Sequence, residues 1–139
     1  MNCASSLIPH PSSLEMLCLE SLTAGYGGAP ALCDFSLQVA SGQIAAVIGP
    51  NGCGKSTLLR CVAGLIAPSG GRVRLDDDDV TLLPPRERAR RVALLPQHFA
   101  GGDDLTVEEM ALLGRTPYLP PYGAPSPNDH AVAARAAAG

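Results

Sequence analysis

The sequence predicts an α/β fold built around a phosphate-binding loop, and three observations predict it. Residues 49–57 read Gly-Pro-Asn-Gly-Cys-Gly-Lys-Ser-Thr and fit the pattern G-x-x-x-x-G-K-[S/T] at every fixed position. An unbroken apolar run over 44–48 precedes the loop, as expected of a parallel strand covered on both faces. Apolar residues at helical spacing follow it, at Leu58, Cys61, Val62 and Leu65. A strand, a glycine-rich loop and a helix in this order are the context in which such a loop binds phosphate.

The loop residues suit a nucleoside triphosphate bound with magnesium. Glycines let the backbone fold closely around phosphate oxygens, and we expect the backbone N–H groups of residues 52–55 to donate to them. The Lys55 ammonium can reach the β- and γ-phosphates, the Ser56 hydroxyl can bind Mg²⁺, and Thr57 follows near the α-phosphate. The nucleotide-binding residues predicted from the loop are Gly49, Pro50, Asn51, Gly52, Cys53, Gly54, Lys55, Ser56 and Thr57.

Length and composition fit one globular domain better than a nucleic-acid-binding module. The chain has 139 residues, 46% of them hydrophobic, and a net charge of −3. A basic face for nucleic acid is therefore not expected. Lys55 is the single lysine among ten basic residues, and it stands where phosphate binding needs a positive charge.

The cysteines and the amino-terminal residues indicate a reducing, cytoplasmic environment. Five cysteines, at positions 3, 18, 33, 53 and 61, include no C-x-x-C pair, so neither a zinc site nor a disulfide framework is predicted. No apolar stretch is long enough to cross a bilayer, and no signal-peptide pattern opens the chain. Residues 1–16 are rich in Ser and Pro and predict a disordered extension, with Met16 as a second candidate start.

The first half of the chain predicts a small antiparallel sheet joined to the phosphate loop. Strand-like segments at 17–19 and 32–39 flank a turn-rich stretch over 24–28. The helix after the loop is expected to end near Gly64, and residues 72–75 are expected to return as a strand.

Four consecutive aspartates, at 76–79, predict a turn. Like charges in sequence are typical of a solvated segment, and here they separate a strand from the next segment. The alternative is that residues 73–76 form the acidic strand end that holds water and magnesium in enzymes with this loop. That strand is normally a continuous apolar run, and Arg72 and Arg74 interrupt it.

Further along, the sequence predicts the beginning of a helical part. Residues 85–91 can form a short basic helix, and the apolar residues 92–96 predict a second strand with Gln97 at its end. A capping box over 106–109 opens a helix that Gly114 closes.

A proline-rich loop and one more helix complete the predicted elements. Residues 117–127 hold five prolines and predict the loop. Asn128 or Asp129 is expected to cap a last helix over 131–138.

The order of these parts resembles that of the ATP-binding subunits of ABC transporters, from about residue 17 to the end of the chain. The wording G-P-N-G-C-G-K-S-T is close to that of the family, and Tyr26 lies ahead of it where the family places an aromatic residue. Residues 91–97 look like the strand leading into the family's Q-loop. Residues 105–109 and 114–117 resemble the importers of iron chelates, haem and cobalamin.

The resemblance implies specific roles, cofactors and partners. It implies that Tyr26 stacks on adenine, and that Gln97 helps to bind Mg²⁺ and senses the membrane subunits. It implies that residues 105–115 contact transmembrane permease subunits, and that a second ATP-binding subunit completes the ATP site. The implied cofactors are ATP and Mg²⁺. The implied location is the inner face of the plasma membrane, held through the permease without direct membrane insertion.

Three family features have no counterpart after Gln97 in this sequence: the L-S-G-G-Q signature, the buried Walker B strand ending in Asp-Glu, and the switch histidine. Residues 17–139 therefore look like a truncated, partial ATP-binding domain that includes the beginning of the helical subdomain. In the family, the absent parts clamp the γ-phosphate and orient the attacking water. We therefore expect this chain to bind ATP weakly and not to hydrolyse it.

The expected function is that of the ATP-binding component of a bacterial ABC importer of the iron-siderophore, haem or cobalamin type. Two alternatives stay open. One is a fragment of a non-transport ABC-type ATPase acting on DNA or ribosomes, against which the net charge argues. The other is a non-catalytic nucleotide-binding remnant. A small P-loop kinase fits Tyr26 and the segment ending in Gln97 poorly.

Overall fold

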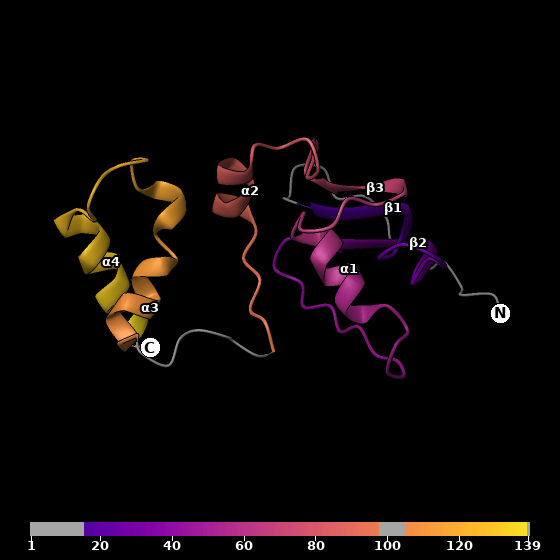
Figure 1. Cartoon of the computed structure of the whole chain (residues 1–139), viewed down its shortest axis with the longest axis horizontal. Helices are drawn as coiled ribbons and strands as arrows, with labels where there is room; N and C mark the ends of the chain where they lie inside the picture. The colour runs from indigo at the N-terminus through magenta and orange to yellow at the C-terminus, as the bar shows by residue number, and fades with distance from the viewer. Residues whose placement is uncertain (1–15, 98–104, 139) are drawn as a thin grey trace. The chain divides into compact units, whose positions relative to one another are not determined.

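The computed structural model describes residues 16–97 and 105–138 of the chain, which divide into two compact units between Pro84 and Pro85 (Figure 1). The extension expected over 1–16 lies outside the described residues except for Met16, where the first strand begins. The first unit carries the sheet and the phosphate loop, and the second carries helices.

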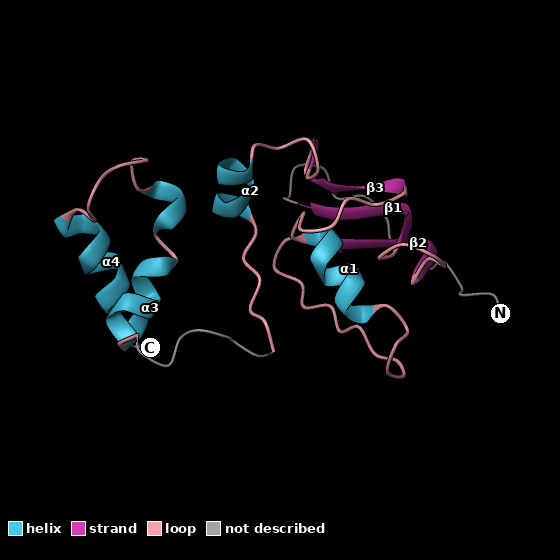
Figure 2. Ribbon diagram, viewed as in Figure 1, coloured by secondary structure: helices cyan, strands magenta, loops and turns pink. Residues whose placement is uncertain are grey.

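Among its described residues, the first unit contains a four-stranded antiparallel sheet in the order β2-β1-β3-β4. Figure 2 labels the strands β2, β1 and β3 of this sheet. The strands are β1 (Met16–Ala24), β2 (Leu32–Ala40), β3 (Gly70–Leu75) and the short β4 (Asp78–Asp79). The sheet confirms the small antiparallel subdomain and the strand near 72–75 that the sequence predicts.

Strand β1, in the centre of this sheet, contains a bulge. The register of β1 shifts against β2 between Leu19 and Leu22, and Ser21 there adopts a φ of 46°. Gly71 of β3 has a φ of 72°, and a Cβ on it would lie 2.2 Å from the carbonyl oxygen of Glu20. A side chain at position 71 would therefore collide with the backbone of the bulge, so this position requires glycine.

The helix α1 (Lys55–Val62) lies beside the sheet (Figure 2), and its apolar side chains pack with those of the sheet to form the core of the first unit. The largest side chains that are fully buried are Leu19, Leu22, Cys61, Val73 and Val80. Leu58, one helical turn before Cys61, joins the same cluster. Each such side chain contributes about 1.5–3 kcal/mol when buried. This packing fixes α1, and with it the loop that precedes the helix, against the sheet.

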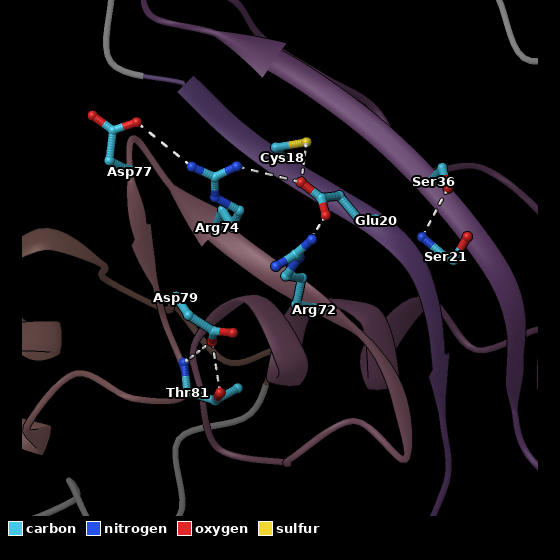
Figure 3. A network of polar contacts seen from close by, with 9 residues as sticks. All are labelled: Cys18, Glu20, Ser21, Ser36, Arg72, Arg74, Asp77, Asp79 and Thr81. Carbon is cyan, nitrogen blue, oxygen red and sulfur yellow. Dashed lines mark hydrogen bonds and ion pairs between the residues drawn. The ribbon is translucent and has the colours of Figure 1, made fainter.

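Charged side chains of β1 and β3 form an ion-pair cluster (Figure 3). Arg72 Nε donates to Glu20 Oε2 at 2.5 Å, and Arg74 Nη1 lies 3.5 Å from Glu20 Oε1. The hydrogen bond from Arg72 and the two positive charges lower the pKa of Glu20. The arginines interrupt the apolar pattern of β3 because an antiparallel strand can have one solvated face.

The aspartate run forms a hairpin turn, as the sequence predicts. Residues 76 and 77 make the turn, while residues 78 and 79 pair with β3 as β4. Asp77 lies 3.5 Å from Arg74, and Asp79 accepts hydrogen bonds from the backbone and hydroxyl of Thr81 (Figure 3). No group of three or more candidate metal-binding side chains occurs within 16–97 and 105–138.

Two segments predicted as buried strands are not strands in the structure. Residues 44–48 have no regular structure, and Ile44 and Ile48 are 100% and 91% exposed. Residues 92–96 also lack regular structure, and Leu95 is exposed. A parallel strand forms only by pairing with neighbouring strands. All strand pairs of the described residues lie in the antiparallel sheet, so the prediction of strands here is wrong.

The second unit contains α2 (Pro85–Arg91), α3 (Val107–Leu113), the 3₁₀ helix η1 (Thr116–Tyr118) and α4 (Pro127–Ala137). The capping box of α3 is confirmed, because Thr106 accepts from the Glu109 backbone and Glu109 accepts from that of Thr106. Gly114 caps the other end of α3, as predicted. Helices α3 and α4 contact each other.

The predicted cap of α4 is wrong. The N-cap is Ser126, and the helix begins at Pro127, ahead of the expected start at 131. Asp129 is the third helical residue, and its carboxylate accepts from the Ser126 backbone at 3.0 Å. The pattern S-P-N-D supplies a complete capping box with proline at the first helical position, which outweighs an isolated Asn or Asp as a cap.

No helix among the described residues is both long enough and apolar enough to cross a bilayer.

Candidate functional site

The predicted phosphate loop connects 44–48 to α1 and has the backbone conformation that its glycines allow. Gly52 and Gly54 adopt left-handed φ angles of 80° and 95°. The Cys53 backbone N–H donates to the Pro50 carbonyl at 3.4 Å and closes a turn. Gly54 is the N-cap of α1 and offers no side chain to the first helical N–H groups. These N–H groups and the helix dipole are left available to an anion.

Lys55 folds back over this loop. Its Nζ donates to the carbonyl oxygens of Gly49 at 2.8 Å and Pro50 at 2.7 Å, and lies 3.8 Å from Cys53 Sγ. The ammonium is therefore held over the loop by neutral acceptors. A phosphate oxygen is a stronger acceptor than a carbonyl because it is charged. The ammonium can therefore exchange a carbonyl partner for a phosphate.

The two hydroxyl residues after Lys55 differ in exposure. Ser56 is exposed, so its hydroxyl is accessible to a magnesium ion at the start of α1. The Thr57 residue is 4% exposed and is part of the buried interior. This arrangement fits the predicted role of Ser56, and it leaves mainly the backbone N–H of Thr57 for a phosphate.

The loop that carries Tyr26 packs directly against the phosphate loop. It leaves β1 at Ala24 and returns at Ala31, whose backbone N–H donates to the Ala24 carbonyl at 2.8 Å. A Cβ on Gly54 would lie only 2.6 Å from the Ala31 carbonyl oxygen and 2.8 Å from Leu32 Cδ2. The glycine therefore lets the two loops touch, which brings the predicted platform for the base next to the predicted site for the phosphates.

Tyr26 has an exposed ring and a partner that the sequence analysis missed. The residue is 62% exposed, as a stacking platform must be. Its hydroxyl accepts a hydrogen bond from Arg60 Nη1, and the guanidinium carbon lies 5.7 Å from the ring centroid. Arg60 lies on α1, five residues after Lys55, and no motif marks it as functional.

Gln97 belongs to the second unit and is exposed. Its predicted role in magnesium binding therefore stays a prediction.

The loop contains glycines with left-handed φ angles, the Lys55 ammonium lies over it, and the amino terminus of α1 follows it. This arrangement is typical of nucleotide-binding P-loop proteins. The comparisons with known proteins identify the class more narrowly. The family model described as ABC transporter matches residues 32–138, which include the whole phosphate loop.

Individual relatives agree with that match. The chain is 48% identical over 103 residues to the hemin import ATP-binding protein HmuV of Pseudomonas entomophila, covering 74% of this chain and 40% of that protein. It is 42% identical over 101 residues to the ferric enterobactin transport ATP-binding protein FepC of Escherichia coli, covering 73% of this chain and 37% of that protein.

A solved structure supports the fold. A nucleotide-free ATP-binding cassette from an ABC transporter matches 84% of this chain and 45% of its own chain, with a TM-score of 0.67 and 30% identity. The chain therefore belongs to the ABC transporter family, in its ATP-binding domain, and has the P-loop NTPase fold. It spans about two fifths of the length of the curated relatives that it matches.

Proposed function

We propose that this chain binds ATP with Mg²⁺ at the junction of the phosphate loop and the Tyr26 loop. The observation that carries the proposal is the close approach of Gly54 to Ala31, which joins the two loops. The family match adds that such domains bind nucleotide. A base on Tyr26 and phosphates on residues 49–57 would then belong to one ligand.

Each residue has a distinct task in this proposal. The backbone N–H groups of residues 52–55 and the Lys55 ammonium hold the phosphates, while Tyr26 stacks on adenine. The Ser56 hydroxyl holds the magnesium ion, and a role for Gln97 in magnesium binding rests on the family resemblance alone. When bound, the ion neutralises negative charge on the β- and γ-phosphates.

The family match further supports a role in transport. The two relatives described above are named for hemin import and ferric enterobactin transport. By analogy, the chain contributes the ATP-binding component of a bacterial importer for iron-siderophore, haem or cobalamin cargo. It works with permease subunits and a second ATP-binding subunit at the inner face of the membrane. This analogy is with the full length of those relatives, of which this chain spans about two fifths.

For the 139 residues alone we propose binding without turnover. Hydrolysis needs a carboxylate near a positioned water. In the first unit the aspartate run forms a hairpin turn, in which Asp77 contacts Arg74 and Asp79 contacts Thr81. We therefore do not assign the catalytic carboxylate to this run. Phosphate release above background in purified chain, if Lys55→Ala abolished it, would contradict this part of the proposal.

Calorimetric titration with Mg-ATP tests the binding proposal. Lys55→Ala should abolish measurable binding because it removes the only lysine of the chain. Arg135→Ala is the matched control, since it removes one positive charge from an exposed position on α4. Equal affinity in wild type and Lys55→Ala would refute the proposed site, whatever the control shows.

A further inference from the structure

We infer that Arg60 is a positioning residue for the adenine platform: it holds the Tyr26 ring in place for the base. This inference rests on the proposed function, since it assumes that Tyr26 stacks on adenine. Arg60 and Tyr26 are 34 residues apart in the chain, and they meet because α1 packs on the sheet that carries the Tyr26 loop.

The contact is made at the end of the tyrosine ring. Arg60 Nη1 donates to the Tyr26 hydroxyl, and the guanidinium carbon is 5.7 Å from the ring centroid. That distance is near the outer limit of a cation–π contact, about 6 Å. The hydrogen bond is therefore the main interaction between the two side chains. It restrains the Tyr26 hydroxyl, while the residue remains exposed and the ring can stack on a base.

Tyr26 needs such a support because its own loop constrains it weakly. The ring is exposed, and the residue is followed by Gly27 and Gly28, which adopt φ angles of 91° and 85°. Glycine has the greatest backbone freedom of any residue, so these two glycines restrain the position of the Tyr26 ring only weakly. A ring that is already held loses less freedom when the base binds, which improves affinity.

Arg60 could instead act on the phosphates as a second cation, and the two roles predict different ligand dependence. Its α-carbon lies about 7.5 Å along α1 from that of Lys55. A phosphate contact would strengthen the binding of inorganic tripolyphosphate and ATP alike. A contact that positions Tyr26 strengthens only the binding of a ligand that carries a base.

The experiment compares Mg-ATP and Mg-tripolyphosphate by calorimetry in wild type, Arg60→Met, Tyr26→Phe and the double variant. Arg60→Met should raise the Kd for ATP about 2- to 10-fold, the scale of one hydrogen bond, and change the Kd for tripolyphosphate less than about twofold. In the Tyr26→Phe background Arg60→Met should have no further effect, because the hydroxyl is already gone. Arg60→Lys keeps a donor and should restore part of the ATP affinity.

Three results would overturn the inference. The first is an equal loss of ATP and tripolyphosphate binding in Arg60→Met. The second is additive losses of ATP binding in the double variant. The third is that Arg60→Met leaves ATP binding unchanged while Tyr26→Ala, made in the wild-type chain, weakens it. Thermal unfolding of each variant separates these results from a folding defect, and Arg60→Leu, which also lacks a donor, repeats the test if Arg60→Met does not fold. Failure of the proposed function is recognised separately, by ATP binding that survives Lys55→Ala.

Discussion

The α-carbon of Gly54 lies against the carbonyl group of Ala31, so closely that a Cβ on Gly54 would come within 2.6 Å of the Ala31 oxygen. The two segments that we propose to bind the base and the phosphates of a nucleotide are joined at this point. Gly54 also has a φ of 95°, which residues with a side chain rarely adopt. Both the close approach and the backbone conformation require glycine, so the pattern position that marks a phosphate loop also positions the Tyr26 loop.

Gly54→Ala is therefore expected to disrupt both folding and ATP binding. Strain at a left-handed φ and collision with backbone together should lower the free energy of unfolding by about 3 kcal/mol. ATP binding should be lost, since relief of the collision moves the two loops apart. Urea denaturation and calorimetry on the purified variant measure the two effects.

Gly42→Ala is the matched control for this substitution. Gly42 has a φ of 76°, and a Cβ on it would meet nothing within 4 Å. The variant should therefore show only the conformational cost, about 1–2 kcal/mol, with ATP binding unchanged. If Gly54→Ala were as stable as Gly42→Ala and bound ATP normally, the contact with Ala31 would have no role in the site.

Cys53 offers a chemical footprint of the phosphate loop. Its thiol is exposed, and its Sγ lies 3.8 Å from Lys55 Nζ. A maleimide on Cys53 should block ATP binding by filling the loop, and ATP should protect the thiol in return. At an ATP concentration ten times the Kd, the labelling rate should fall about tenfold, because about a tenth of the loops stay free. Mass spectrometry of a Cys3→Ser, Cys33→Ser chain follows the reaction.

Cys33 provides the control for this footprint, because its thiol is also exposed but lies on β2. Its labelling in a Cys3→Ser, Cys53→Ser chain should not depend on ATP. Cys18 and Cys61 are buried and should react slowly in both chains. ATP-independent labelling of Cys53 would place the nucleotide away from the loop.

The sequence was sufficient where function and local geometry depend on the same residues. The loop over 49–57 needs glycines at fixed positions and a lysine after them. Its pattern can therefore be recognised in the sequence without knowledge of the rest of the fold. The capping box at Thr106 is equally local, and the structure contains it. The antiparallel sheet also follows from sequence, since a strand with one solvated face can carry Arg72 and Arg74.

The sequence was insufficient where structure depends on distant partners. Residues 44–48 have the composition of a buried strand, but a strand needs a neighbour, and composition does not supply one. The link between Arg60 and Tyr26 joins residues 34 positions apart, and neither residue type marks the other. At Ser126 the error was of another kind, because the S-x-x-D pattern was present and a complete capping box was overlooked.

That same capping box makes the second unit sensitive to acid. The Asp129 residue is 7% exposed, and its carboxylate accepts hydrogen bonds from the Ser126 hydroxyl at 2.5 Å, the Ser126 backbone at 3.0 Å and Arg115 Nε at 2.9 Å. These donors, Ser126 first, lower the pKa of Asp129 from 3.8 to about 2. Folding therefore favours the ionised carboxylate.

A lowered pKa in the folded state means that the contribution of Asp129 to stability is present above pH 4 and is lost as the pH falls towards 2. Asp129→Asn should be less stable than wild type at pH 7, and the difference should shrink over this interval. Urea denaturation followed by the helical circular dichroism signal at several pH values measures it. Glu87→Gln, which neutralises a carboxylate at an exposed position on α2, is the control for the removal of a negative charge as such. A constant difference between Asp129→Asn and wild type from pH 7 to pH 2 would show that the carboxylate is not stabilised as an ion, and that the capping box acts only through its geometry.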